Sequence, residues 1–285
     1  MLKKGDKVGI VCCSNGQKQE YRDKVEGLME TFRLMGLQPV LSDCIYEREG
    51  VAAGTAKERA KCLMEFYKEE EIKVIFDISG GDIANEILSY IDFDSISQTQ
   101  KELWGYSDLT TLLNAIYSKT GKTSVLYQVR NLISGDGEKQ RLDFVASVLN
   151  EKPDLFDFSY RFIRGTKVNG VAVGGNIRCL LKLAGTEYFP DVMDKILVLE
   201  ALGAKEPQLV TYFSQLQQMG VFNKVKGILL GTFSKYEENP EDLPIEELVL
   251  RYLPPHLPVV KTDKIGHGTD SKAIRIGGQI DLSDN

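Results

Sequence analysis

The segment Trp104-Gly105-Tyr106-Ser107-Asp108-Leu109-Thr110 has the pattern of a short apolar strand that turns through glycine onto a serine and continues into a helix. A serine at such a sharp turn has an exposed hydroxyl, and the backbone N–H of the next residue is free. A nucleophile that attacks a carbonyl needs both features, because the N–H group can hold the oxyanion that forms. The segment therefore predicts an α/β fold with a nucleophile, Ser107, at the end of a strand.

Strand and helix patterns alternate on both sides of this segment. Continuous apolar runs such as Val8–Cys13 are typical of strands that are buried on both faces. The β-α-β-α series predicts an open, mostly parallel sheet with flanking helices, which binds its ligands at the carboxyl ends of the strands. The expected strands of this half are Val8–Cys13, Gln38–Leu41, Ile72–Ile78 and Leu103–Tyr106, and the expected helices are Glu20–Met35, Ala56–Glu70, Asp82–Tyr90 and Asp108–Ser118.

The stretch from Asn150 to Gly165 has no clean helical or strand period, and we interpret it as a crossing between two domains. We predict an N-terminal α/β domain over residues 1–150, a linker over 151–165 and a smaller C-terminal domain over 166–285. The elements expected in the second domain are strands at Val168–Val173, Lys195–Leu199 and Gly227–Leu230, helices at Ile177–Ala184, Pro207–Met219 and Ile245–Leu253, and a hairpin at Ala273–Leu282 across Gly277-Gly278.

Composition excludes several classes of function. The 285 residues carry a net charge of -6, which argues against sequence-independent nucleic-acid binding. A run of about 18 apolar residues, the length that a membrane-spanning helix needs, is absent, and no secretory signal pattern stands at the N-terminus. The five cysteines are odd in number and lack metal-ligand spacing, which favours free thiols in a reducing cytosol. We therefore expect a cytoplasmic protein without metal, cofactor, nucleic-acid or membrane partner.

A serine nucleophile needs a base, and the chain has only two histidines. His256 follows two prolines in an expected exposed loop, whereas His267 lies between glycines that permit close backbone approach, so His267 is the better candidate. Glu200 ends the apolar run that starts at Lys195, where a carboxylate needs a partner to stay ionised. The alternative interpretations are that His267 is a loop histidine without a role and that Glu200 is an acid at a strand end that emerges into water.

Two glycine pairs precede expected helices. The Gly81 N–H could face the Asp108 N–H and complete an oxyanion hole, although most Gly-Gly pairs are only tight turns. Asn176, after Gly174-Gly175, could bind substrate or cap the following helix. Arg178 could bind a terminal carboxylate, although an arginine at such a position is more often a solvated residue on a helix surface.

These residues resemble the serine LD-carboxypeptidases, the peptidase family that includes the muramoyl-tetrapeptide carboxypeptidases and the microcin C immunity peptidases. The matching segments follow one another through almost the whole chain, so the resemblance does not rest on a single motif. They are Gly5–Val11, Gly80-Gly81, Gly105–Thr110, Gly174-Gly175-Asn176, Leu183–Thr186, Lys195–Glu200 and Gly266-His267-Gly268.

The resemblance implies that Ser107 is the nucleophile, His267 its general base and Glu200 the acid that orients the histidine. It places the oxyanion hole at the N–H groups of Gly81 and Asp108. It also implies an N-terminal α/β domain with the serine and a C-terminal α/β domain, with a β-rich or barrel-like sheet, that carries the acid and the histidine. The active site would lie in the cleft between them, usually in a homodimer.

Two departures from the family pattern concern the same site. Many members have Arg-Gly-Gly-Tyr-Gly at the oxyanion turn, where this chain has Ser79-Gly80-Gly81-Asp82-Ile83. The glycines and their backbone donors are kept, whereas the side chains near the substrate entrance differ. In many members a second acid follows the strand-end glutamate, but here Ala201 follows Glu200. Glu200 is therefore the one acid available at that strand end.

We expect an LD-carboxypeptidase that releases the terminal D-alanine from murein tetrapeptides in cell-wall recycling. One alternative is a peptidase that uses the same triad to inactivate a peptidyl-nucleotide antibiotic of the microcin C type. The other is a binding or sensor protein that keeps the fold without turnover. The presence of Ser107, Glu200 and His267 together argues against this last alternative.

Overall fold

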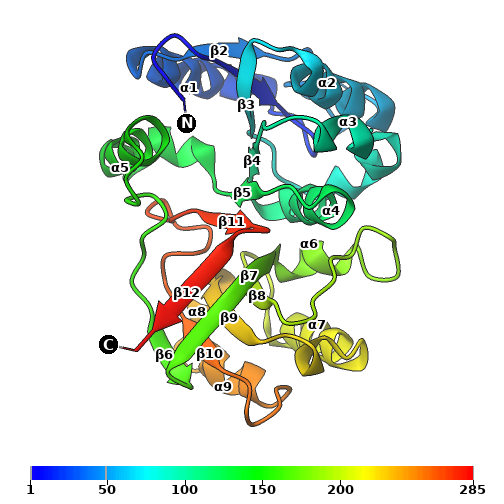
Figure 1. Ribbon diagram of the computed structural model, residues 1–285, viewed down its shortest axis with the longest axis vertical. Helices are drawn as coiled ribbons and strands as arrows, with labels where there is room; N and C mark the ends of the chain where they lie inside the picture. Colours follow the sequence, from blue (N-terminus) through cyan, green and yellow to red (C-terminus); the bar gives the residue numbers. More distant parts are fainter. Residues whose placement is uncertain (1, 49, 285) are drawn as a thin grey trace.

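The computed structural model describes residues 2–48 and 50–284, and their strands form two six-stranded sheets. Figure 1 shows the two sheets in separate halves of the molecule, with the N-terminal half above and the C-terminal half below. Helices α4 and α6 face each other across the junction, close to strands β5 and β11. The α/β architecture expected from the sequence, with a mostly parallel first sheet, is confirmed.

The first sheet has the strand order β11-β5-β4-β3-β1-β2, in which β1 to β5 are parallel and β11 is antiparallel. Its strands are β1 (Lys7–Val11), β2 (Gln38–Leu41), β3 (Ile72–Asp77), β4 (Leu103–Gly105), β5 (Ser124–Leu126) and β11 (Ile274–Ile276). The helices of this half are α1 (Arg22–Leu34), α2 (Ala56–Lys68), α3 (Phe93–Ser97), α4 (Thr110–Thr120) and α5 (Gly137–Asn150).

The second sheet has the order β12-β7-β8-β9-β10-β6, with four parallel strands in the centre and an antiparallel strand at each edge. It is curled into a half-barrel, as the expectation of a barrel-like sheet required. Its strands are β6 (Arg161–Arg164), β7 (Lys167–Asn176), β8 (Ile196–Ala201), β9 (Gly227–Phe233), β10 (Val259–Lys261) and β12 (Gln279–Ser283). The helices of this half are α6 (Ile177–Leu181), α7 (Glu206–Gln218), α8 (Ser234–Glu237) and α9 (Ile245–Leu250).

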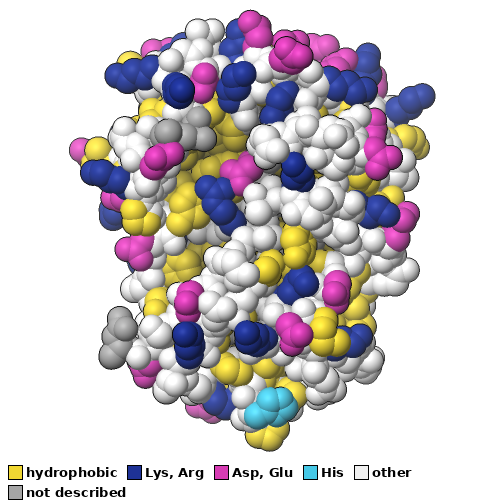
Figure 2. Space-filling view, in the orientation of Figure 1, with side chains coloured by type: hydrophobic (Ala, Val, Ile, Leu, Met, Phe, Trp, Pro, Cys, Tyr) yellow, Lys and Arg dark blue, Asp and Glu magenta, His cyan; other side chains and the backbone are white. Residues whose placement is uncertain are grey.

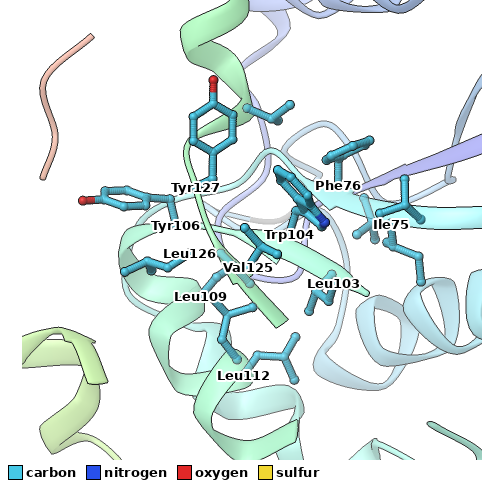
Figure 3. Close-up of a cluster of buried hydrophobic side chains, with 14 of the residues drawn as sticks. Ile75, Phe76, Leu103, Trp104, Tyr106, Leu109, Leu112, Val125, Leu126 and Tyr127 are labelled. Carbon is cyan, nitrogen blue, oxygen red and sulfur yellow. The ribbon is translucent and has the colours of Figure 1, made fainter. Parts of the chain in front are cut away.

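Strand β4, which leads to Ser107, is fixed by an aromatic core. Trp104 packs against Phe76 of β3, with ring centroids 5.5 Å apart, and against Tyr127, with centroids 6.0 Å apart. Figure 3 shows these side chains together with Leu109 and the other buried residues around the strand. Large aromatic rings of this kind contribute strongly to burial energy and leave little freedom for the strand. This packing therefore fixes the position of β4, the strand that precedes Ser107.

Two expectations need correction. Ala273–Leu282 is not a hairpin, because β11 pairs with β5 of the first sheet and β12 pairs with β7 of the second. The alternating pattern predicted both strands correctly, but each strand pairs with the edge of a different sheet. Residues 82–90, expected as an α-helix, form a 3₁₀ helix only from Ala84 to Tyr90.

The predicted domain limits stay a prediction, and the pairing of two strands departs from them. β6 (Arg161–Arg164) lies inside the predicted linker and pairs with β10, and β11 belongs by sequence to the second half but by pairing to the first. The chain thus passes between the halves again on each side of β11.

Within the described residues, no helix is both long and apolar enough to span a membrane. All five cysteines are buried and free, as expected. On the face shown in Figure 2, lysine and arginine side chains are interspersed with aspartate and glutamate side chains over both halves.

Candidate active site

Ser107 stands at a strained turn between β4 and α4. Its φ of 55° lies in the left-handed region, which is uncommon for a residue other than glycine and is found at functional turns. A Cβ atom at Gly105 would lie 2.8 Å from the side chain of Leu109, so only glycine lets the turn close this tightly. Ser107 remains partly exposed, whereas its neighbours Tyr106 and Asp108 are buried. The local structure thus presents the serine hydroxyl as a nucleophilic elbow does.

Glu200 and His267 form a hydrogen-bonded pair. Glu200 lies near the end of β8, and its Oε2 is 2.7 Å from Nδ1 of His267, which lies in the loop after β10. The Glu200 side chain is fully buried and that of His267 is 9% exposed. The carboxylate accepts a hydrogen bond from Nδ1–H, which leaves the lone pair on Nε2 as the basic position. Among the described residues, Nε2 has no hydrogen-bond partner.

Tyr106 connects the elbow to this pair. Its ring lies edge-on to the imidazole of His267, with ring centroids 4.9 Å apart. Burial raises the pKa of the Tyr106 hydroxyl well above its usual value, and the nearby charge of Glu200 raises it further. The ring of the residue before the nucleophile therefore packs directly on the histidine.

The turn Ser79-Gly80-Gly81 is fixed by the buried carboxylate of Asp77. Oδ1 of Asp77 accepts hydrogen bonds from the backbone N–H and the hydroxyl of Ser79, at 2.7 and 2.5 Å, and Oδ2 accepts one from the Cys13 N–H at 2.7 Å. Burial raises the pKa of Asp77. These hydrogen bonds fix the backbone of Ser79, two residues before Gly81.

Gly81 has a φ of 107°, and a Cβ atom there would lie 2.1 Å from the side chain of Asn15. Within the described residues its N–H donates to no protein acceptor. The Asp108 N–H lies in the first turn of a helix, where backbone donors have no intrahelical partner. Two backbone donors at neighbouring strand ends are thus available for an anion, which is the requirement for an oxyanion hole.

The side chain of Asp108 ties the oxyanion turn to both halves of the molecule. Its Oδ2 accepts hydrogen bonds from the Ser14 hydroxyl at 2.6 Å and from the Ala84 N–H at 2.8 Å. Its Oδ1 accepts one from Lys182, which follows α6 in the second half, at 2.5 Å. Asp108 is completely buried, so Lys182 supplies the countercharge that such a carboxylate requires.

Two cavities are lined by these residues. One, of about 390 Å³, is lined by Gly81, Ser107 and Asn176, together with the residues that follow Glu200. The other, of about 520 Å³, is lined by His267 and by Arg130 from the segment after β5. In the described part of the chain, Ser107 and His267 form no hydrogen bond with each other. Catalytic hydrogen bonds of this kind are often long in a ligand-free enzyme and shorten when substrate binds.

The remaining predicted residues have defined positions. Asn176 caps α6, since its Oδ1 accepts a hydrogen bond from the Cys179 N–H at 3.3 Å, and it also lines the smaller cavity. Asn176 is therefore a helix cap that also borders the cavity in which Ser107 lies. Arg178 lines the same cavity as Ser107 and forms an exposed ion pair with Asp82, which Lys182 also contacts. His256 is exposed, as expected for a loop residue without a role in the site.

Sequence patterns did not predict a role in the site for Asp77, Lys182, Tyr106 or Arg130. Asp77 had a usable signal, because it ends a buried strand in the same way as Glu200. Lys182 and Arg130 gave none, since the position of each relative to the site depends on tertiary contacts. Within residues 2–48 and 50–284, no three histidine, cysteine or acidic side chains converge in a way that could hold a metal ion.

Comparisons with known proteins give matches over both halves of the chain. Residues 8–127 match the LD-carboxypeptidase N-terminal domain, and residues 169–282 match the LD-carboxypeptidase C-terminal domain. A probable murein peptide carboxypeptidase of Bacillus subtilis is 27% identical over 99% of this chain and 90% of its own length. The microcin C7 self-immunity protein MccF of Escherichia coli is 26% identical over 82% of this chain and 77% of its own length.

Solved structures show the same fold. A structure of the microcin C7 self-immunity protein MccF superposes with a TM-score of 0.88 at 22% identity, over 100% of this chain and 97% of its own. The muramoyltetrapeptide carboxypeptidase of Oxalobacter formigenes superposes with a TM-score of 0.82 at 22% identity, over 98% of this chain and 95% of its own. At these identities, the structural likeness supports the architecture of both halves.

Proposed function

Because the chain belongs to the LD-carboxypeptidase family, a family of serine peptidases, we propose that it releases the C-terminal D-alanine of murein tetrapeptides through Ser107, His267 and Glu200. The observation that carries this proposal is the 2.7 Å hydrogen bond between Glu200 and His267, held against the residue that precedes Ser107. The relative named as a murein peptide carboxypeptidase supports the choice of substrate.

The proposed reaction is an acyl transfer. Nε2 of His267 takes the proton of the Ser107 hydroxyl as its oxygen attacks the carbonyl of the residue before the terminal D-alanine. The N–H groups of Gly81 and Asp108 hold the oxyanion that forms. His267 then protonates the departing amine of D-alanine as the peptide bond breaks. A water molecule, activated by the same histidine, releases the tripeptide from the serine ester.

The first test is the release of D-alanine from L-Ala-γ-D-Glu-L-Lys-D-Ala and from the counterpart with diaminopimelate in the third position. Mass spectrometry would follow D-alanine with the wild-type protein and with Ser107→Ala. We expect release by the wild type and none by the variant. Equal release by both proteins would contradict the assignment of Ser107, and release by neither would contradict the choice of substrate.

A second candidate is the cleavage of a peptidyl-nucleotide antibiotic of the microcin C type. The likeness to the microcin C7 self-immunity protein MccF favours this substrate class, and the larger cavity has more room than D-alanine needs. The same pair of proteins, incubated with an aspartyl or glutamyl nucleotide analogue, distinguishes the two substrates. A preference for the nucleotide analogue would make antibiotic resistance the function in place of cell-wall recycling.

We further propose that the enzyme acts in the cytoplasm as a homodimer. Five free, buried thiols fit a reducing compartment. The family resemblance supports the dimer. Light scattering on the purified protein would measure the molar mass, and a monomer at micromolar concentration would contradict this proposal.

A further inference from the structure

The larger cavity has a feature that the proposed triad does not use. Of its charged or ionisable lining residues, Arg130, Lys24 and His267 are basic, and none of the described residues that line it is acidic. The protein as a whole carries a net charge of -6, so a cavity without acidic side chains is a local departure from the overall balance. Such a cavity favours an anionic ligand.

Arg130 is less exposed than Lys24, the other charged side chain that lines this cavity. Within the described residues its guanidinium forms no ion pair, and its side chain makes one hydrogen bond, from Nε to the side chain of Gln128 at 3.3 Å. Burial lowers the pKa of the guanidinium, although arginine stays charged in proteins. The two terminal nitrogens are therefore free to form a bidentate bond with an anion.

Arg130 lies close to the proposed oxyanion hole. A Cβ atom built on Gly80 would lie 3.6 Å from Nη2 of Arg130, so the guanidinium rests against the oxyanion turn one residue before Gly81. The neighbouring Asn131 donates hydrogen bonds to the Gly268 carbonyl at 3.2 Å and to the Ser271 hydroxyl at 2.9 Å. The same segment thus carries a free cation and holds the loop of His267.

The two cavities offer separate places for the two products of the proposed acyl transfer. The histidine must protonate the leaving amine, so the leaving group lies in the cavity that His267 lines. The acyl part stays bonded to Ser107, in the cavity that Ser107 and Gly81 line. The leaving D-alanine carries the terminal carboxylate of the substrate, and this places an anion beside Arg130.

We propose that Arg130 binds the terminal carboxylate of the leaving amino acid and makes the enzyme a carboxypeptidase. This assignment rests on the proposed function, and it replaces Arg178, which is paired with Asp82. A phosphate on a nucleotide leaving group offers the same anionic chemistry, so the experiment must separate the two anions.

The test compares two substrates, the tetrapeptide that ends in D-alanine and the same peptide that ends in D-alaninamide, with wild type, Arg130→Gln and Arg130→Lys. Loss of one partner of a desolvated charge pair lowers kcat/KM by about 30-fold or more. We expect this loss for Arg130→Gln on the acid, no more than about 3-fold loss on the amide, and an intermediate value for Arg130→Lys. Equal losses on acid and amide would overturn the proposal, because they would indicate a structural role.

Arg33→Gln is the matched control, since this exposed arginine of α1 pairs with Glu26 and Glu30 on the surface. It should leave both substrates unaffected. Wild-type activity of Arg130→Gln on the amide would also show that the variant folds.

A binding measurement separates this proposal from the proposed function. In Ser107→Ala, calorimetry should show tighter binding of the acid than of the amide, and Arg130→Gln in that background should abolish the difference. Equal affinities for acid and amide in Ser107→Ala would overturn the assignment even if the wild type releases D-alanine. Activity confined to a peptidyl-nucleotide, with a 30-fold loss in Arg130→Gln, would refute the proposed function and assign Arg130 to a phosphate instead.

Discussion

The ring of Tyr106 lies edge-on to the imidazole of His267, with ring centroids 4.9 Å apart and an interplanar angle of 72°. The residue before the proposed nucleophile therefore packs directly on the proposed base, although the two are 161 positions apart in the sequence (267 − 106). We expect Tyr106→Leu to lower kcat by at least 10-fold because the imidazole loses its support, as small misplacements in an active site cost about 100-fold.

Tyr106→Phe separates the ring from the hydroxyl. The hydroxyl is buried without a protein partner among the described residues, so its removal should cost little stability or increase it slightly. We expect kcat to fall by less than about 10-fold, because the ring that packs on His267 remains. Thermal unfolding and kcat, measured together on both variants, check this pair. A larger loss for Tyr106→Phe than for Tyr106→Leu would contradict it.

Glu200→Gln should lower kcat by about 10⁴-fold without unfolding the protein. The amide is nearly isosteric with the carboxylate, but it no longer stabilises the imidazolium or fixes the tautomer that leaves Nε2 basic. Because members of a triad act as a unit, Ser107→Ala with Glu200→Gln should be no less active than Ser107→Ala alone. Single-turnover kinetics on the three variants provides the measurement, and additive losses would refute the assignment of Glu200.

Lys182→Met should destabilise the protein by about 3–5 kcal/mol, because it leaves the charge of Asp108 buried without its partner. The double variant Lys182→Met with Asp108→Asn should recover part of this loss, since the orphaned charge is then removed. The Asp108 N–H is kept in every variant, so the oxyanion donor is unaffected. Urea unfolding measures the difference, and a double variant less stable than Lys182→Met alone would contradict the role of this ion pair.

Asp77 gives the stability a specific pH dependence. Burial raises its pKa in the folded state, so the folded protein binds the proton more tightly than the unfolded chain does. The stabilising contribution is complete below the pKa of the unfolded chain and is lost as the pH rises through the raised, folded-state pKa. The free energy of unfolding of wild type minus that of Asp77→Asn should therefore decrease with rising pH in this window.

Urea unfolding of both proteins at closely spaced pH values gives this difference directly. A difference that grows as the pH rises would mean that the three hydrogen bonds to Asp77 outweigh its burial.

The sequence predicted the parts of the site that depend on local patterns. Ser107 and Gly81 follow strands of one parallel sheet, so their strand ends had to meet at the same edge. His267 was found because the alternative, His256, follows two prolines, and Glu200 because it ends a buried run. None of these inferences required knowledge of how the two halves pack.

Tertiary contacts decided what the sequence could not predict. Strand β5 is only three residues long, so neither it nor Arg130 in the segment after it gave a periodic signal. The pattern at Ala273–Leu282 showed two strands but not which open edges they would join. Lys182 pairs with Asp108 only because α6 lies against the elbow, and no local pattern encodes that contact.

The pairing of β11 with β5 also sets an order of events during synthesis. The N-terminal sheet lacks its last strand until residues 274–276 have left the ribosome, although its other five strands are complete by residue 126. Until then the edge of β5 is open, and an open strand edge is a template for association with other chains. The growing chain therefore passes through a long interval in which this strand edge is unpaired, and the proposed base, His267, is made only shortly before the strand that closes the edge.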